Sequence, residues 1–146
     1  MDTQLEQPNP QDMERIATLL AYSNQMAIEV GQSPFDASLD DLPRLQSLAD
    51  IIRQVGSAKQ QRLALQALGI SFGQVLATQD KNYDWWMIDD VDGRDPCLRY
   101  RDTDLLVFPL TLISRRVEEG EEVRVDELYQ EITDQLQATV AQHFNA

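Results

Sequence analysis

Residues 85–122 read WWMIDDVDGRDPCLRYRDTDLLVFPLTLISRRVEEGEE, and this stretch decides how the chain folds. The dipeptide Asp92-Gly93 lies between two segments rich in aromatic and aliphatic residues. Both of its positions tolerate the positive φ angles that a two-residue hairpin turn requires. The sequence therefore predicts an antiparallel hairpin that turns at Asp92-Gly93, with a further turn around Asp102-Thr103. The expected strands span about 83–90, 96–101 and 104–108.

This turn also predicts how the side chains divide between the two faces of the sheet, because strand residues alternate. Trp85 should face Tyr100 on one side, and Trp86 should face Arg99 on the other. One face is then entirely apolar and should pack on helices; it contains Trp85, Met87, Leu98, Tyr100, Leu105 and Val107. The reverse face is mixed; it contains Trp86, Ile88, Cys97, Leu106, Phe108, Arg99 and Arg101. Asp84 and Asp104 should flank Arg101, which would make that arginine structural.

Helical patterns lie on both sides of this stretch. Capping residues, prolines at first turns, apolar residues at helical spacing and terminal glycines mark their ends. The expected helices begin near Pro10, Ser38, Ser57, Pro109 and Asp126. The fold class is therefore α+β, with a small three-stranded antiparallel sheet packed with about five α-helices. We expect one domain over residues 1–146, with residues 1–9 disordered.

Gly69 and Gly73 lie in the interior of the third expected helix, where each glycine costs about 1 kcal/mol relative to alanine. One interpretation is a small-residue groove that another helix or the sheet approaches closely. The alternative is a ligand that approaches the helix backbone at this point.

The charge of the chain restricts its partners. It carries 25 acidic and 12 basic residues, a formal net charge of -13. Such a surface repels nucleic-acid phosphates and anionic membranes, so we expect neither as a partner. The N-terminal residues show no secretory signal, and no window is apolar enough for a membrane span. We expect a cytoplasmic protein, with a mature form lacking its signal as the alternative.

The residues of familiar active sites are scarce. His143 is the one histidine and Cys97 the one cysteine, so Ser-His-Asp, Cys-His and zinc sites lack their parts. The acidic residues around Gly93 could suggest a calcium-binding loop. Aligning Gly93 with the invariant glycine of such a loop places Ile88 and Arg99 at ligand positions, and neither side chain can bind calcium, so this template fails. We expect no catalytic residue, no metal site and no cofactor.

The helix sequence LGISFGQVL, a tryptophan-containing strand and the block GRDPCLRYRDTDLLVFPL together resemble a bacterial family known as a domain of unknown function. The resemblance covers roughly Leu68 to Leu136. It implies an α+β fold and transfers no activity or catalytic residue.

Three hypotheses of function remain. The first is a non-enzymatic binding or adaptor domain with a protein partner or a second copy of itself, acting through Trp86, Arg99 and Leu106. The second is a sensor of a small anion, which would be bound by an arginine cluster drawn from Arg94, Arg99, Arg101, Arg115 and Arg116. The third is an unrecognised carboxylate-dependent hydrolase. An exposed reverse face favours the first, a concave arginine-lined pocket the second, and converging carboxylates in a cleft the third. Helices covering both faces would instead make Arg99 an ordinary structural residue.

Overall fold

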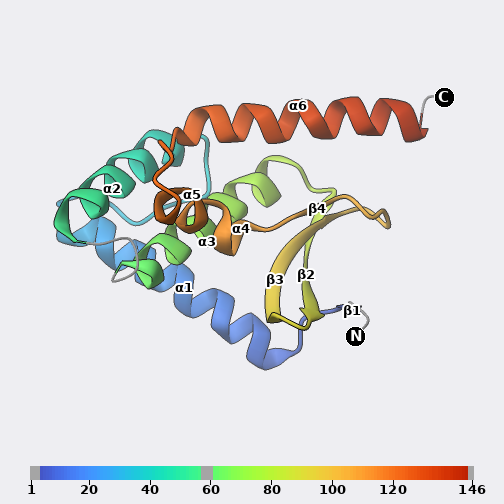
Figure 1. The fold of residues 1–146 in the computed structure, drawn as a ribbon, viewed down its shortest axis with the longest axis horizontal. Helices are drawn as coiled ribbons and strands as arrows, with labels where there is room; N and C mark the ends of the chain where they lie inside the picture. The colour runs from blue at the N-terminus through green and yellow to red at the C-terminus, as the bar shows by residue number, and fades with distance from the viewer. Residues whose placement is uncertain (1–3, 57–60, 145–146) are drawn as a thin grey trace.

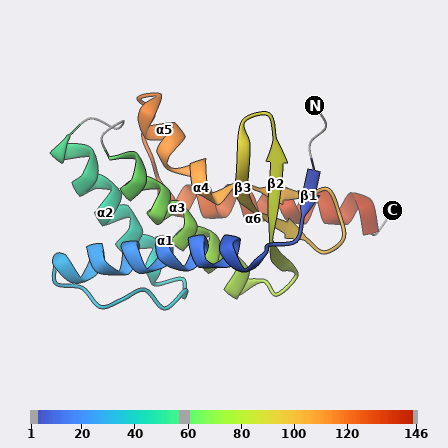
Figure 2. The same ribbon diagram turned by 90° about the horizontal axis from the view of Figure 1, so that it is seen from below.

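The computed structural model describes residues 4–56 and 61–144 and has an α+β architecture (Figure 1). Helices and the sheet form two sides of the molecule, and the last helix runs across both (Figures 1 and 2). The elements in chain order are β1 (Gln4–Glu6), α1 (Pro10–Glu29), α2 (Asp41–Val55), α3 (Arg62–Gln79), β2 (Tyr83–Asp90), β3 (Gly93–Tyr100), β4 (Leu106–Val107), α4 (Pro109–Leu112), α5 (Ser114–Glu118) and α6 (Val125–Phe144).

Local sequence accounts for the start of α1. The Asn9 side chain accepts a hydrogen bond from the Asp12 backbone N–H at 2.8 Å, and the Asp12 carboxylate accepts one from the Asn9 N–H at 2.9 Å. This capping box satisfies two N–H groups that helical hydrogen bonding leaves unpaired. Gly31 follows the helix with a φ of +82°, as expected of a helix-ending glycine.

Helix α3 is the centre of the core. Leu65, Leu68, Phe72 and Val75 are fully buried, and α1, α2, α4 and α5 all pack against this helix. A Cβ on Gly69 would clash with the carbonyl oxygen of Pro109, so the start of α4 lies directly on the helix backbone. This geometry confirms the close-approach interpretation of the two glycines. The expected helix start at Ser57 lies outside the described residues.

The sheet has the strand order β1-β2-β3-β4, all antiparallel, so it contains one strand more than the sequence predicted. The additional strand, β1, falls within residues that we expected to be disordered. It pairs with the outer edge of β2 through Leu5 opposite Ile88. Three polar-flanked residues carry too little periodicity to identify a strand, and only the neighbouring edge of β2 gives them hydrogen-bond partners.

The hairpin register differs from the prediction. Asp90 pairs with Gly93, so Val91-Asp92 form the turn, and Trp85 faces Leu98 rather than Tyr100. The Asp90 carboxylate accepts a hydrogen bond from the Asp92 N–H at 2.9 Å, which stabilises this earlier turn. Trp86 therefore faces Cys97, and Asp84 faces Arg99. The predicted pairing between the second and third strands is confirmed, with Leu98 opposite Val107 and Arg99 opposite Leu106.

The register shift is two residues in total, so every side chain keeps its predicted face. Met87, Leu98 and Tyr100 are buried on the apolar face, where α3 and α4 cover the sheet. Arg101 is the exception, because it lies beyond the end of β3 with a φ of +51°. Its guanidinium lies over the Tyr100 ring, 5.4 Å from the centroid. The predicted cross-strand pairing of Arg101 with Asp84 is wrong.

The C-terminal third contains two short helices and one long one. The single helix expected from Pro109 to Gly120 is divided into α4 and α5 at Ile113, which is fully buried. Helix α6 begins at Val125, one residue before the predicted capping residue Asp126. The Gln46 side chain on α2 accepts a hydrogen bond from the Val125 N–H at 2.7 Å and donates one to the Val123 carbonyl at 2.9 Å. These two bonds attach the start of α6 to α2.

Candidate functional site

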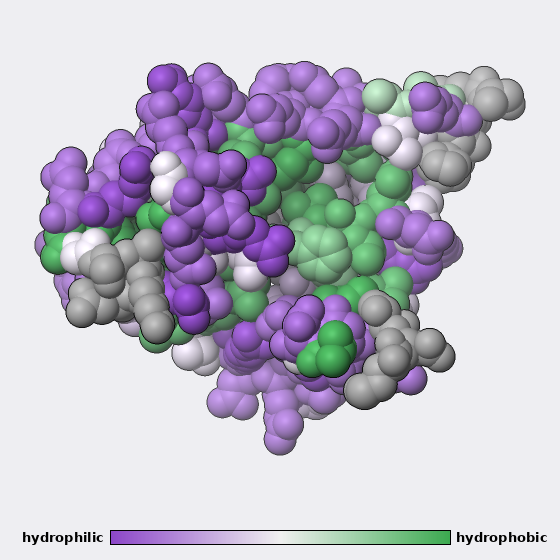
Figure 3. Space-filling model, in the orientation of Figure 1, coloured by the Kyte–Doolittle hydropathy of each residue, from purple (hydrophilic) through white to green (hydrophobic). Residues whose placement is uncertain are grey.

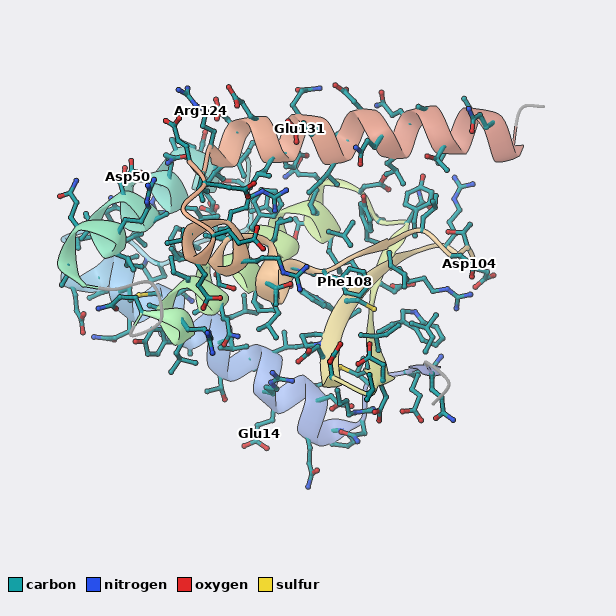
Figure 4. The ribbon with its side chains drawn as sticks, viewed as in Figure 1. Glu14, Asp50, Asp104, Phe108, Arg124 and Glu131 are labelled. Carbon is teal, nitrogen blue, oxygen red and sulfur yellow. The ribbon has the colours of Figure 1, made fainter. Side chains whose placement is uncertain are left out.

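An open groove lies between the β4–α5 segment and α6. Its volume is about 420 Å³, within the range of roughly 300–1,000 Å³ typical of ligand sites. Apolar side chains gather beneath α6 in Figure 3, and Figure 4 places Phe108 in this region. The lining residues are Tyr83, Leu105, Leu106, Val107, Phe108, Thr111, Leu112, Arg115, Arg116, Leu128, Glu131, Ile132, Gln135, Leu136 and Thr139.

Strand β4 forms one side of this groove and is also an edge of the sheet. The Tyr100 N–H donates to the Leu105 carbonyl at 3.0 Å, which makes these residues a hydrogen-bonded pair. Antiparallel pairs alternate between hydrogen-bonded and non-hydrogen-bonded, so Leu106 opposite Arg99 is the non-hydrogen-bonded kind. The N–H and C=O of Leu106 therefore point away from β3, along the open edge of the sheet.

Helix α6 forms the opposite side. Its apolar stripe of Leu128, Ile132 and Leu136 lines the groove, and its first turns are held by α2. Tyr129 packs edge-on against Phe72 of α3, with ring centroids 6.3 Å apart. The helix is thus fixed at its N-terminal half and continues past the sheet at its C-terminal half (Figure 1).

Two arginines on α5 lie in the wall of the groove. The Arg116 guanidinium donates to the Leu112 carbonyl at 2.8 Å, which orients it along the helix. Arg115 is exposed, and no carboxylate of the described residues lies within salt-bridge distance of it. Among the described residues, Glu131 is the one acidic residue that lines the groove. The lining therefore carries one net positive charge, in a chain whose total charge is -13.

Tyr83 adds a buried polar atom to the groove. Only 5% of the residue is exposed, and its hydroxyl has no hydrogen-bond partner among the described residues. Burial raises the pKa of this hydroxyl, and nearby Asp80 raises it further, so it stays protonated at neutral pH. A buried hydroxyl without a partner costs about 1–3 kcal/mol.

Of the six candidate binding residues, the structure brings three together here: Leu106, Arg115 and Arg116 all line the groove. The other three lie elsewhere. Trp86 and Arg99 are on the reverse face of the sheet, where the Arg99 guanidinium stacks over the Trp86 ring at 4.7 Å from the centroid. Arg99 also donates to the Thr103 carbonyl at 2.8 Å. Its side chain is therefore held by its own sheet and loop, with Asp84 directly opposite.

Arg94 belongs to an ion network at the hairpin end of the sheet. It forms salt bridges with Glu6, Asp12 and Asp89, including one of 2.7 Å to Asp12. The hydrogen bonds from Arg94 lower the pKa of the Asp12 carboxyl, so Asp12 is ionised and unsuited to donate a proton. These contacts join β1, α1, β2 and β3, and the Arg94 guanidinium already has three carboxylate partners.

The remaining reactive residues show no catalytic arrangement in the described part of the chain. Cys97 is fully buried, and burial raises the pKa of its thiol to about 11, which disfavours the reactive thiolate. Over residues 4–56 and 61–144, no group of three or more histidine, cysteine, aspartate or glutamate side chains is placed to hold a metal ion. Carboxylates do not converge in the groove either, since Glu131 stands alone there.

Sequence reasoning missed several groove residues, notably Tyr83, Phe108 and the inner residues of α6. The apolar stripe of α6 is visible in the sequence, but it is equally typical of a helix that is packed on the core. Phe108 is 44% exposed. This exposure depends on which elements cover the end of β4, and it could not be predicted from the sequence.

The fold and this groove define an α+β domain in which a long helix faces an open sheet edge. The chain belongs to the DUF3806 family, a domain of unknown function, whose model matches residues 44–129.

A crystal structure of a protein from Bacteroides thetaiotaomicron VPI-5482 shares this fold, with a TM-score of 0.82 and 18% sequence identity. The similarity covers 92% of this chain and 48% of that one, so the chain spans about half the length of the neighbour. No curated protein matches the sequence. None of the described helices combines the length and apolar character needed to cross a membrane.

Proposed function

We propose that this chain is a non-enzymatic binding domain that recognises a segment of another protein in the groove between β4 and α6. The observation that carries this proposal is the exposed apolar lining centred on Phe108, which is 44% exposed beside an open sheet edge. Exposed apolar surface rimmed by polar residues is typical of protein-interaction sites. The arginines on α5 supply the polar rim, and arginine is over-represented among binding hot spots.

This proposal places the binding surface at the β4 edge of the sheet, where Leu106 and Phe108 border the groove, rather than at Trp86 and Arg99. Both sites contain residues of the original candidate set, but Arg99 is already held by Trp86 and the Thr103 carbonyl. The groove instead combines an open strand edge with the exposed Arg115. The partner is a different protein or a second copy of the chain.

The test compares two serine substitutions of exposed apolar residues. Phe108→Ser should abolish the recovery of specific partners from a lysate of the source organism, and should weaken binding of the purified partner by calorimetry. Val91→Ser is the control, because Val91 is 77% exposed at the hairpin tip, away from the groove. If Phe108→Ser retained full affinity while Val91→Ser lost it, the groove would not be the binding site. Light scattering on the purified chain tests for self-association.

A second candidate function is the sensing of a small anion with an apolar portion. The groove volume of about 420 Å³ and the exposed Arg115 in its wall favour it. Such a ligand should raise the melting temperature of the wild type in a thermal-shift screen of carboxylates, and Arg115→Gln should remove the shift. A carboxylate that gives equal shifts with both proteins would contradict an arginine-dependent site.

A further inference from the structure

We infer that the partner segment binds in extended conformation and adds a strand to the open edge of β4, with an acidic group at Arg115. This inference rests on the proposed function and specifies what the groove recognises. It follows from the backbone of Leu106, the separation of β4 from α6, and the charges of the lining.

The backbone of β4 is prepared for a further strand. The N–H and C=O of Leu106 point away from β3, as the pairing of Tyr100 with Leu105 requires. An unpaired strand edge is a template for another extended chain, and its main-chain hydrogen bonds supply affinity without regard to sequence. Pro109 lacks an N–H, so the template ends where α4 begins.

The groove also leaves room beside this edge. Helix α6 packs on α2, and the groove of about 420 Å³ lies between α6 and the β4–α5 segment. Figure 1 shows β4 and α6 running in opposite directions on the two sides of this space. Neighbouring strands lie about 4.8 Å apart, so an added strand would pass between β4 and α6. Alternate side chains would then contact Leu106 and Phe108 on one side and Ile132 and Leu136 on the other.

Charge selects one end of the bound segment. Arg115 and Arg116 lie at the α5 end of the groove, where they outnumber the single Glu131 of the lining. The rest of this acidic chain repels anions, so the arginines favour an acidic side chain or a terminal carboxylate at that end. The expected segment therefore alternates apolar and polar residues and carries an acidic group next to Arg115.

The experiment selects a phage-displayed library of random decapeptides on the immobilised wild-type chain. We expect enriched sequences with alternating apolar residues and an aspartate or glutamate toward one end. The best peptide is then synthesised, and its affinity is measured by calorimetry against the wild type and five variants. Enrichment of peptides with helical spacing, or no enrichment at all, would overturn the inference.

Leu106→Pro removes the outward-pointing N–H without removing a hydrogen bond to β3, which is where proline is tolerated in an edge strand. It should weaken the peptide by at least about fivefold relative to Leu106→Ala, which loses the side chain but keeps the N–H. Arg115→Gln should weaken binding by about three- to tenfold at low salt. Arg53→Gln, an exposed arginine on α2 outside the groove, should leave the affinity unchanged.

A peptide methylated at the backbone nitrogens that face β4 gives an independent test, since the protein is then unaltered. The affinity of the methylated peptide for the wild type should fall to that of the unmodified peptide for the Leu106→Pro variant. Equal binding of the methylated peptide, or of Leu106→Pro and Leu106→Ala, would refute strand addition. If Phe108→Ser abolished that same binding, the groove would remain the binding site and only the extended mode would be wrong.

Discussion

Gly93 and Gly69 show two different physical reasons for a glycine. Gly93 opens β3 with a φ of +124°, and a Cβ there would meet no atom within 4 Å. Its requirement is conformational, because side-chain-bearing residues rarely adopt that angle. Gly69 lies in an ordinary helix, but a Cβ would collide with the Pro109 carbonyl oxygen. Its requirement is steric and arises from α4.

At the residue scale, Gly93→Val should lower the free energy of unfolding by about 1–3 kcal/mol, because a β-branched residue is strained at positive φ. Urea denaturation monitored by tryptophan fluorescence measures the change. Val91→Thr is the matched control in the turn and should be close to neutral. An unchanged denaturation midpoint for Gly93→Val would mean that the turn does not need glycine.

At the scale of elements, the sheet is asymmetric between its two faces. Trp85 contacts both core clusters, and its indole N–H donates to Gln74 on α3 at 3.2 Å. Trp86 lies on the opposite face beneath the Arg99 guanidinium. The two tryptophans are adjacent in the chain, yet only the first joins the sheet to the helices.

Trp85→Ala should therefore destabilise the protein by about 3–5 kcal/mol, as large aromatic truncations in a core do. Trp86→Ala should cost clearly less, because the contact that it removes is a cation–π pair worth about 0.5–1 kcal/mol at an exposed site. Chemical denaturation of both variants provides the comparison. Equal losses would show that the reverse face is packed as tightly as the apolar one.

At the scale of the whole molecule, the Arg94 network connects the N-terminal segment to the sheet. Glu6 on β1, Asp12 on α1 and Asp89 on β2 all pair with this one arginine on β3. Asp12 also caps α1, so the same carboxylate fixes a helix start and a tertiary contact. Loss of the Asp12 charge should weaken both the cap of α1 and the salt bridge to Arg94.

This linkage predicts a dependence of stability on pH. The pKa of Asp12 is lowered in the folded protein from its ordinary value of 3.8. The stabilisation is therefore complete well above that value, and it is lost as pH falls from there through the lower folded pKa. Asp12→Asn should lower stability at pH 7 and flatten the acid limb, as measured by unfolding between pH 2 and 7. Asp126→Asn, an exposed carboxylate at the start of α6, is the control. An acid limb identical to that of the wild type would contradict the role of Asp12.

The α+β class, the helix starts at Pro10 and Pro109 and the division of strand residues between two faces followed from the sequence alone. Each depends on interactions within a few residues, such as the Asn9 capping box and the alternation of Trp85 and Trp86. The exact hairpin pairing was missed because Asp92-Gly93 and Val91-Asp92 are both acceptable turns. The two registers differ by two residues in the partner that each residue faces, as when Trp85 faces Leu98 instead of Tyr100. Such a shift leaves every side chain on the same face, so hydrophobic patterning cannot distinguish the two registers.

Tertiary structure alone decided the candidate site. Arg115 on α5, Leu106 on β4 and Leu136 on α6 are brought together only when α6 is attached to α2 through Gln46. Likewise, β1 forms because the edge of β2 is open to it. Arg94 forms salt bridges with three acidic residues that come from other elements. Local sequence determines which conformation a segment prefers and which of its faces is apolar. Which faces meet, and which edge remains open, depends on contacts between residues far apart in the chain.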